Sequence, residues 1–446
     1  MGRFIVEGRA SLSGTIGVAG NKNEALPLIA ASLLCTMPQQ FSNVPDIGDV
    51  RSMVEIAGIL GAQVEWKDEC TVVINGSAIT TSTLPMKQSS KIRASILFAS
   101  SLLVRTGKAL IIEPGGDTIG RRRLDTHFLV FRALGAKLYI ERRGTQEVTE
   151  ETTFILDAPD GLVGADIYLD EASVTATENA IIAAAGARGR TTINNAASEP
   201  HVQGLCRYLE KLGVEISGIG SNILTIDGCG HFNASVHFKI GADIIEAGSF
   251  IGLAAATRSA ITINGVEPHL MRMVLLQFER IGVVVEYDQH AQSLFVPDKQ
   301  PLKIRKDIGA AIPRIEDSPW PGFPTDLMSI LLVTATQSEG TCLIHEKMFE
   351  SRLYFVDKLI AMGAQIVLCD PHRAVVVGPS SLYGAAISSP DIRAGMALLI
   401  AALAAEGRSV IDNIDQIDRG YQSIDTRLQS LGAQIERTSD RRKFSS

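Results

Sequence analysis

The chain has 446 residues, of which 46% are hydrophobic and 20% are charged. This composition is typical of a globular protein that is long enough for two or three domains. The formal net charge of −7 argues against a nucleic-acid-binding or anionic-membrane surface. An anion site would therefore have to be a local cluster of arginine and lysine.

The sequence shows no targeting or metal-binding pattern. The N-terminus lacks the apolar core of a signal peptide, and apolar stretches such as residues 395–405 are shorter than the roughly 20 residues of a membrane helix. We therefore expect a soluble cytoplasmic protein. The cysteines form no CxxC pair and have no zinc spacing, and we predict that all are buried free thiols in a reducing compartment. They are Cys35, Cys70, Cys206, Cys229, Cys342 and Cys369.

One short pattern recurs six times along the chain. Each copy has an apolar helical stretch, then Leu, Ile or Met followed by Gly and by Ala or Val, and then an alternating strand. Glycine after a helix takes up a left-handed conformation that other residues resist, so each copy predicts a helix that ends and turns into a strand. The copies are 69 to 81 residues apart, which indicates an internal repeat. Their glycines are Gly61, Gly135, Gly213, Gly282, Gly363 and Gly432.

The interior of each copy recurs as well. An extended segment leads into a helix of small apolar residues, which should be buried, and a second strand and an amphipathic helix follow. We predict an α/β fold of six βαβαββ units, in two domains of three units with a ligand-binding cleft between them. Residues 1–21 should pair with the last unit. The first domain would then be 22–238, and the second would combine 1–21 with 239–446.

Charged residues that occur in only one copy are functional candidates. In the first copy, Lys22 and Asn23 follow a strand and begin a buried helix, whose free N–H groups suit an anion; a solvent-exposed lysine is the alternative. In the second copy, Arg93 begins a buried helix. The tight turn that follows carries Asp117 and Arg122, either as a functional loop or as a charged surface loop.

The fifth and sixth copies add more candidates. Thr325 is predicted to cap a helix, with Asp326 in its first turn, where a capping aspartate is the alternative role. An arginine just before an apolar helix is costly unless it meets an anion. If the cations of all copies converge, they would bind a ligand with both a carboxylate and a phosphate. The further candidates here are Arg352, Asp391, Arg393 and Arg419.

The motifs GNKN, PGGDTIGRRRLD, SVTATEN, NAASEP, FPTD, FESR, DIRAG and IDRGY occur in this order over nearly the whole chain. Together they resemble the enolpyruvyltransferases, in particular the branch that acts on nucleotide sugars. The resemblance implies a fold of two inside-out α/β barrels. It also implies transfer of enolpyruvyl from phosphoenolpyruvate to the 3-hydroxyl of UDP-N-acetylglucosamine, the first committed step of peptidoglycan synthesis. No metal, cofactor or obligate protein partner is expected.

The resemblance also implies roles for the candidate residues. The phosphate of phosphoenolpyruvate would contact Lys22, Arg122 and Arg419, and its carboxylate would contact Arg352 and Arg393.

The remaining candidates would hold the sugar nucleotide. Asn23 and Asp326 would contact the sugar, with Asp326 as the base at the attacked hydroxyl, and Arg93 would reach toward the diphosphate. The uridine site would be lined by Asp125, Ser173 and Val174.

Asp117 stands in loop 113–124 where most members of the family carry cysteine and a subset carries aspartate. It would be the acid that protonates C3 of phosphoenolpyruvate, in a loop that acts as a mobile lid, and it would make the protein resistant to fosfomycin. The sequence departs from the family pattern at four positions outside the phosphoenolpyruvate half, namely Arg123, Thr175, His201 and Ile244.

Three other functions fit less well. A paralogous enolpyruvyltransferase with another nucleotide or sugar acceptor is the main alternative. A synthase for shikimate 3-phosphate matches the loop and the FPTD motif less closely. A non-catalytic scaffold would have no reason to retain the cationic residues together with Asp326.

Overall fold

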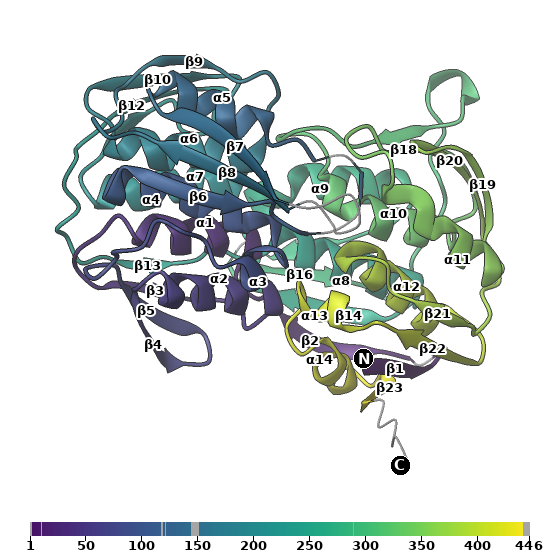
Figure 1. Ribbon diagram of the computed structural model, residues 1–446. Coiled ribbons are helices and arrows are strands. Elements are labelled where there is room, and N and C mark those ends of the chain that lie inside the picture. The colour runs from purple at the N-terminus through teal and green to yellow at the C-terminus, as the bar shows by residue number, and fades with distance from the viewer. Residues whose placement is uncertain are drawn as a thin grey trace. The chain divides into compact units, whose positions relative to one another are not determined.

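The computed structural model describes residues 2–9, 11–116, 119–120, 122–143, 151–288 and 290–439. The chain folds into two compact units, each with its own core. Unit 1 holds the described residues of 1–19 and 242–446 together with Ile119 and Gly120, and unit 2 holds those of 20–117 and 122–241. Figure 1 draws unit 2 in purple to teal and most of unit 1 in green to yellow.

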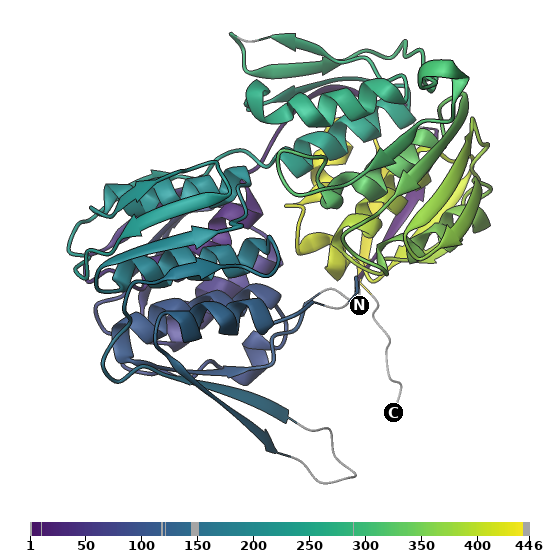
Figure 2. The same cartoon turned by 90° about the horizontal axis from the view of Figure 1, so that it is seen from above.

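In unit 2, three sheets lie around helices of small residues (Figure 1). The inner helices are α1 (Lys22–Ser32), η1 (Arg93–Leu97), α4 (Phe98–Thr106) and α6 (Val174–Gly186). The other helices are α2 (Gly48–Ile59), α3 (Met86–Ser89), α5 (Asp125–Ala133) and α7 (Pro200–Lys211). The strands are β3 (Gln39–Ser42), β4 (Gln63–Asp68), β5 (Thr71–Asn75), β6 (Lys108–Ile112), β7 (Lys137–Arg143), β8 (Glu151–Asp157), β9 (Asp166–Tyr168), β10 (Arg190–Asn194), β11 (Glu215–Ser217), β12 (Ile223–Asp227) and β13 (His237–Lys239). In Figure 2, β7 and β8 form the long blue ribbon of this unit.

Unit 1 repeats this plan. Its inner helices α8 (Ile244–Ala256), α10 (Met328–Ala335) and α12 (Ile392–Ala404) contact one another in all three pairs. The remaining helices are α9 (Pro268–Arg280), η2 (Ile308–Ala310), η3 (Thr325–Leu327), η4 (Arg352–Phe355), α11 (Val356–Ala361), α13 (Asp415–Asp418) and α14 (Ile424–Ser430). The strands are β1 (Gly2–Glu7), β2 (Ser13–Gly17), β14 (Ala260–Asn264), β15 (Glu286–Asp288), β16 (Ser293–Val296), β17 (Arg314–Glu316), β18 (Gly340–His345), β19 (Gln365–Asp370), β20 (Arg373–Gly378), β21 (Ala386–Ser388), β22 (Arg408–Asp412) and β23 (Gln434–Ser439).

The sixfold repeat is visible in the sheets. In each of the five four-stranded sheets of the described residues, one short edge strand pairs in parallel with its neighbour, and the other pairs are antiparallel. In the sheet of β6, β7 and β8, a bridge between Thr83 and Leu110 takes the place of that edge strand. Helices buried on nearly every face lie inside the sheets, and no closed barrel of strands forms within the described ranges.

The N-terminal strands pair differently from the prediction. β1 joins β22 and β23 of the last repeat, as expected. β2, however, pairs with β14 of the fourth repeat, and β13 pairs with β3 of the first repeat. The chain thus changes units after the parallel edge strand and before the inner helix. The prediction that all of 1–21 joins the last repeat was wrong for β2, because this exchange depends on partners that are distant in sequence.

Each of the two crossings begins at a residue that is bound by a buried glutamate on an inner helix. In unit 2, Glu24 Oε2 accepts a hydrogen bond of 2.7 Å from the backbone N–H of Gly241. In unit 1, Glu246 Oε2 accepts one of 2.6 Å from Ala19 N–H and also binds Arg427. Each unit therefore holds the end of the segment that leaves it.

The six repeat glycines were predicted correctly. All six have φ between 84° and 108°, where a side chain would strain the backbone. The cysteine prediction was wrong for three residues, because Cys70 and Cys229 are half-buried and Cys369 is exposed on the outer face of β19. Within the described ranges, no helix is long and apolar enough to cross a membrane.

Candidate functional site

Polar side chains cap the starts of inner helices in both units. Asn21 accepts a hydrogen bond from the first turn of α1, and Ser173 does so for α6. In unit 1, Asp243 and Asp391 each accept two backbone hydrogen bonds at the starts of α8 and α12. These ends carry the positive pole of the helix and free N–H groups, so an anion is stabilised near them.

Lys22 is buried at the start of α1, so the alternative of a solvent-exposed lysine was wrong. Its Nζ lies 2.6 Å from Asp49 Oδ2, and the two side chains are only 10% and 6% exposed. Asn23, the next residue, is half-buried. Asp49 was not among the predicted residues, because its pairing with Lys22 joins two helices that the sequence does not relate. The pair fixes the ammonium group at the helix start.

Arg93 and Arg122 lie close together in unit 2. Arg93 Nη2 donates hydrogen bonds to the carbonyl oxygens of Arg122 (2.6 Å) and Arg123 (2.8 Å). Burial, followed by the charge of Arg122, lowers the pKa of Arg93 to about 10. Two neighbouring guanidinium groups repel each other, and a bound anion would relieve that repulsion. Asp117, predicted to act in the same loop, lies outside the described residues.

The other predicted residues of unit 2 follow this loop. Asp125 is the first residue of α5, and its Oδ2 accepts a hydrogen bond of 3.2 Å from Arg123 Nε. Arg123 Nη2 also donates to Asp170 Oδ2 at 3.0 Å. Ser173 caps α6 and Val174 begins it. Arg123, one of the four departures from the family pattern, thus joins the start of α5 to the segment that leads into α6.

A buried histidine that the sequence analysis did not single out lies behind these residues. His127 Nδ1 is 2.8 Å from Asn179 Nδ2, and its Nε2 is 3.2 Å from the hydroxyl of Thr175. Burial, and then the charges of Arg93 and Arg122, lower the pKa of His127 to about 3. The ring is therefore neutral at pH 7. Because the Asn179 amide can only donate, Nδ1 accepts and Nε2 carries the hydrogen. Thr175, a second departure, is thereby tied to the histidine.

In unit 1, one carboxylate joins two arginines. Asp326 Oδ1 lies 3.0 Å from Arg352 Nη2, and its Oδ2 lies 3.0 Å from Arg393 Nε. Both arginine side chains are about 95% buried, and Arg393 also lies over the ring of Tyr421. The structure thus brings together three residues that are separated by up to 67 positions in the chain. A capping role for Asp326 does not explain this arrangement.

Each of the two arginines has a guanidinium N–H group without a hydrogen-bond partner among the described residues. These groups are Nη1 of Arg352 and Nη1 of Arg393, and both are buried. An unsatisfied buried donor costs about 1–3 kcal/mol, and more when it is charged. Such a cost is offset when an anion with two oxygen atoms binds. A carboxylate has two such oxygen atoms, so it could accept a hydrogen bond from each of the two Nη1 groups.

Thr325 does not cap its helix, contrary to the prediction. Pro324 occupies the cap position, and the Thr325 hydroxyl donates to both carboxyl oxygens of Glu346, at 3.0 Å each. The hydroxyl is used as a donor because a carboxyl group lies within reach. Asp391 caps α12, and Arg419 ends α13, where its Nη1 donates to Gln416 at 2.7 Å.

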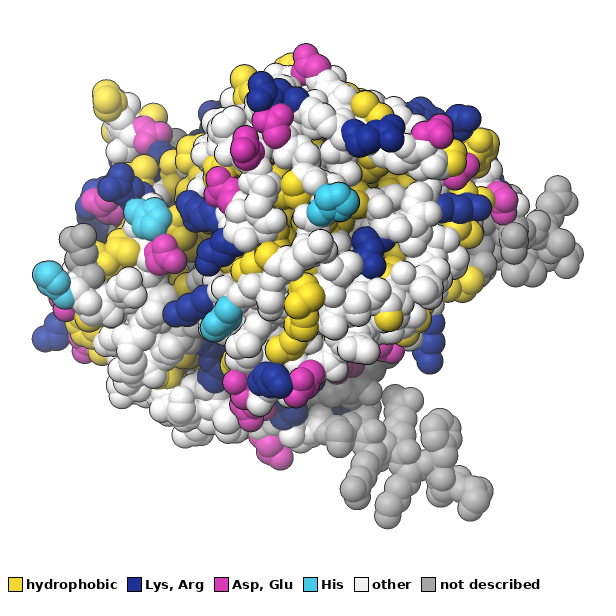
Figure 3. Space-filling model, turned by 90° about the vertical axis from the view of Figure 1, so that its left-hand side faces the viewer, with side chains coloured by type: hydrophobic (Ala, Val, Ile, Leu, Met, Phe, Trp, Pro, Cys, Tyr) yellow, Lys and Arg dark blue, Asp and Glu magenta, His cyan; other side chains and the backbone are white. Residues whose placement is uncertain are grey.

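The candidate residues thus form two groups, one in each unit. Arg93 and Arg122 meet in unit 2, and Asp326, Arg352 and Arg393 meet in unit 1. Convergence of all six cations remains a prediction. On the face drawn in Figure 3, basic and acidic side chains are interspersed, as expected if the cationic sites are local.

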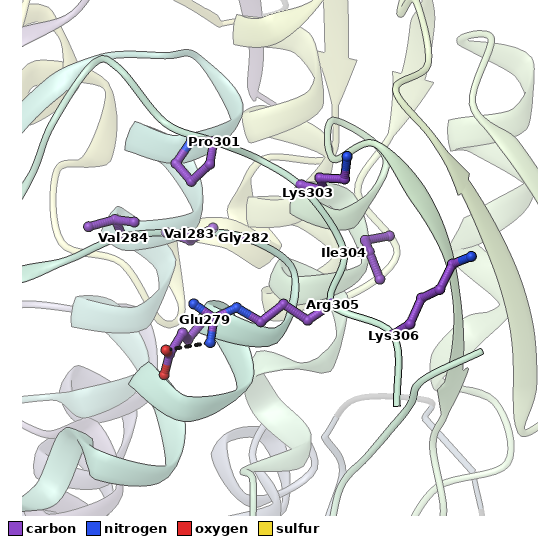
Figure 4. Close-up of a pocket in the computed structure, with 9 residues that line it drawn as sticks. All are labelled: Glu279, Gly282, Val283, Val284, Pro301, Lys303, Ile304, Arg305 and Lys306. Carbon is purple, nitrogen blue, oxygen red and sulfur yellow. Dashed lines mark hydrogen bonds and ion pairs between the residues drawn. The ribbon is translucent and has the colours of Figure 1, made fainter. Parts of the chain in front are cut away.

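A separate pocket of about 530 Å³ lies in unit 1 (Figure 4). It is lined by residues of α9 and of segment 282–306, including Val284, Pro301 and Ile304. Arg305 Nη1 lies 2.6 Å from Glu279 Oε1 at its wall, so its cation is already paired. None of the candidate residues lines this pocket, so it is not the site considered above.

Comparisons with known proteins agree on one family. The profile of the EPSP synthase (3-phosphoshikimate 1-carboxyvinyltransferase) family matches residues 6–428. The UDP-N-acetylglucosamine 1-carboxyvinyltransferase of Treponema denticola is 52% identical to this chain, over 98% of this chain and 99% of that protein. The protein of the same name from Bradyrhizobium diazoefficiens is 51% identical, over 99% of both chains.

Solved structures share the fold. The enolpyruvyl transferase NikO from Streptomyces tendae superposes with a TM-score of 0.83 at 24% identity, covering 98% of this chain and 99% of that one. EPSP synthase from Acinetobacter baumannii superposes with a TM-score of 0.72 at 17% identity, covering 98% and 100%. The α/β fold expected from the repeats is thus that of enolpyruvyl transferases.

Proposed function

The chain belongs to the EPSP synthase family, the enolpyruvyl transferases, and from this premise we propose that it forms the enolpyruvyl ether of UDP-N-acetylglucosamine. The donor would be phosphoenolpyruvate, the acceptor the 3-hydroxyl of the sugar, and the second product phosphate. The observation that carries the chemistry is the pair of buried, unpartnered Nη1 groups of Arg352 and Arg393 beside Asp326. The choice of acceptor is supported by the names of relatives that share about half of their residues with this chain over nearly its whole length.

Asp326 would change partners when phosphoenolpyruvate binds. Its carboxylate now interacts with both arginines, at 3.0 Å each. The substrate carboxylate would bind the Nη1 donors of Arg352 and Arg393. It would then compete with Asp326 for the positive charge of the two guanidinium groups. A carboxylate released from one arginine is a stronger proton acceptor, so Asp326 could then take the proton of the 3-hydroxyl. Binding of the donor would thus prepare the base.

The group in unit 2 would hold the phosphates. Lys22 would contact the phosphate of phosphoenolpyruvate from the start of α1, together with Arg122 and with Arg419 of unit 1. Arg93, already hydrogen-bonded to the backbone at Arg122, would approach the diphosphate of the nucleotide. Asn23 would contact the sugar. The uridine would lie against Asp125, Ser173 and Val174.

The reaction would proceed by addition and elimination. The sugar oxygen forms a bond to C2 of phosphoenolpyruvate while its proton passes to Asp326, and Asp117 gives a proton to C3. The tetrahedral product then loses phosphate from C2 and returns a proton from C3 to the ionised Asp117, which restores the double bond. Asp117 must be protonated to act, and a closed, dry site would favour its neutral form. No metal or cofactor takes part in this scheme.

The proposed role in the cell is the first committed step of peptidoglycan synthesis in the cytoplasm. The experiment that tests the function measures phosphate release from phosphoenolpyruvate with four acceptors offered separately: UDP-N-acetylglucosamine, UDP-glucose, UMP and shikimate 3-phosphate. Release with the first alone is expected. Faster release with another acceptor would assign the chain to a paralogous reaction, and release with none would refute enolpyruvyl transfer.

A further inference from the structure

Two acidic side chains lie buried behind the carboxylate-binding arginines. β17 and β18 run parallel, with Glu316 opposite His345, so the next residues, Asp317 and Glu346, leave the two strands side by side. Both are completely buried. Neither belongs to the proposed catalytic scheme, and neither is a partner of a surface cation.

Their hydrogen bonds leave one buried carboxyl oxygen without a donor. Glu346 Oε1 accepts from Thr325 Oγ1 and from the backbone N–H groups of Met348 (3.2 Å) and Phe349 (3.1 Å). Asp317 Oδ1 accepts from Lys347 N–H at 2.6 Å, whereas Asp317 Oδ2 is buried without any donor among the described groups. Two ionised carboxylates buried side by side would repel each other. A proton on one of them would remove that repulsion and supply the donor that Asp317 Oδ2 lacks.

We propose that Glu346 carries a proton which it donates to Asp317 Oδ2, and that this neutral Glu346 is a positioning residue for Arg352. This proton gives Asp317 Oδ2 the hydrogen-bond donor that it otherwise lacks. The oxygens of Glu346 can still accept hydrogen bonds from the Thr325 hydroxyl and from the backbone N–H groups. Burial, followed by the hydrogen bond with Asp317, raises the pKa of Glu346 to about 9, against the opposing charge of Arg352. The proton is therefore present at pH 7.

The neutral state matters because Arg352 Nε lies 3.8 Å from Glu346 Oε2. An ionised Glu346 would add a second negative charge beside an arginine that Asp326 already neutralises. The attraction of Arg352 for a substrate carboxylate would fall accordingly. The protonated Glu346 is neutral, so the positive charge of Arg352 stays available to the substrate carboxylate. This consequence for substrate binding rests on the proposed function, whereas the shared proton does not.

The other ionisable groups around Glu346 do not supply this proton. Lys347 Nζ is paired with Glu316 Oε1 at 3.3 Å. His372 Nδ1 lies 2.7 Å from the backbone carbonyl of Glu346, so it faces the main chain and not the carboxyl group. Asp326 Oδ1 lies 3.0 Å from Arg352 Nη2.

Two nearly isosteric variants separate the proposal from a packing role. In Glu346→Gln, the amide donates to Asp317 as the acid did, so the KM for phosphoenolpyruvate at pH 7 should stay close to that of the unmodified protein. In Asp317→Asn, the new amide donates to Glu346 and favours its ionised form. The KM should then rise about tenfold or more, with kcat less affected.

The pH profile provides the decisive readout. In the unmodified protein, KM for phosphoenolpyruvate should rise as pH increases through about 9, because Glu346 loses its proton. This rise should be absent in Glu346→Gln. The same rise in Glu346→Gln, or an equal loss of affinity in both variants, would overturn the proposal. This comparison stands even if Asp317→Asn does not fold.

Infrared difference spectroscopy tests the proton without any substrate. The unmodified protein at pH 7 should show the C=O band of a protonated carboxyl group that Glu346→Gln lacks. Absence of that band would refute the shared proton. If the band is present but phosphoenolpyruvate reacts with none of the four acceptors, the proposed function fails while the acid pair stands.

Discussion

Replacing Arg393 with alanine should weaken catalysis without unfolding unit 1. The side chain contributes one ion pair to Asp326 and one buried, unpartnered Nη1 group. A charge-assisted hydrogen bond to a substrate anion is worth about 1.5–3 kcal/mol, so kcat/KM for phosphoenolpyruvate should fall roughly ten- to a hundredfold. Asp326 keeps its second partner, Arg352, so the fold should persist.

The assay is steady-state phosphate release at varied phosphoenolpyruvate, with thermal unfolding measured in parallel. Arg393→Lys should recover only part of the loss, because an ammonium group lacks the planar donors of a guanidinium. Arg373→Ala is the matched control, since Arg373 is 54% exposed and pairs with Asp370 in the same unit. An unchanged kcat/KM in Arg393→Ala would remove this residue from the site, and an equal loss in the control would show that the effect is not local.

Three further predictions concern the loop and the buried histidine. The protein should resist fosfomycin, which alkylates the loop cysteine of family members, since a carboxylic acid is a poor nucleophile; Asp117→Cys should stay active and become sensitive, and Asp117→Asn should lose most activity. Time-dependent inactivation of the unmodified protein would contradict this. Protease cleavage within 113–124 should slow with saturating UDP-N-acetylglucosamine, and an unchanged cleavage rate would count against a lid. His127 has a pKa of about 3 when folded against 6.5 ordinarily, so the unfolded chain binds a proton that the folded chain does not. The free energy of unfolding should therefore fall by up to about 1.4 kcal/mol per pH unit between these values as pH decreases, and His127→Gln should lose this dependence; an identical pH dependence would refute the assignment.

Local features of this fold could be predicted from the sequence. The repeat glycines, such as Gly61 and Gly213, follow from helix-end geometry, which a few neighbouring residues determine. The burial of the inner helices follows from their small apolar residues. The candidate cations could be found because each occurs in only one copy of the repeat, whereas the residues around it recur in the other copies.

Features that depend on distant partners could not be predicted. Nothing near β2 shows that it pairs with β14, more than 200 residues away. Thr325 has the sequence of a helix cap, and only the neighbouring strand brings Glu346 to its hydroxyl. Asp49 and Asp317 gain their roles in the same way, from Lys22 and Glu346. Cys369 is exposed because of its position in the alternation of β19, which a one-residue shift would reverse.

The central claim is that this chain joins an enolpyruvyl group to the 3-hydroxyl of UDP-N-acetylglucosamine. Nuclear magnetic resonance of the product formed from phosphoenolpyruvate and this nucleotide tests it most directly. The account predicts one vinyl ether, attached at the 3-oxygen of the sugar, with one phosphate released per ether formed. A vinyl ether at another oxygen, or phosphate release without any ether, would contradict it.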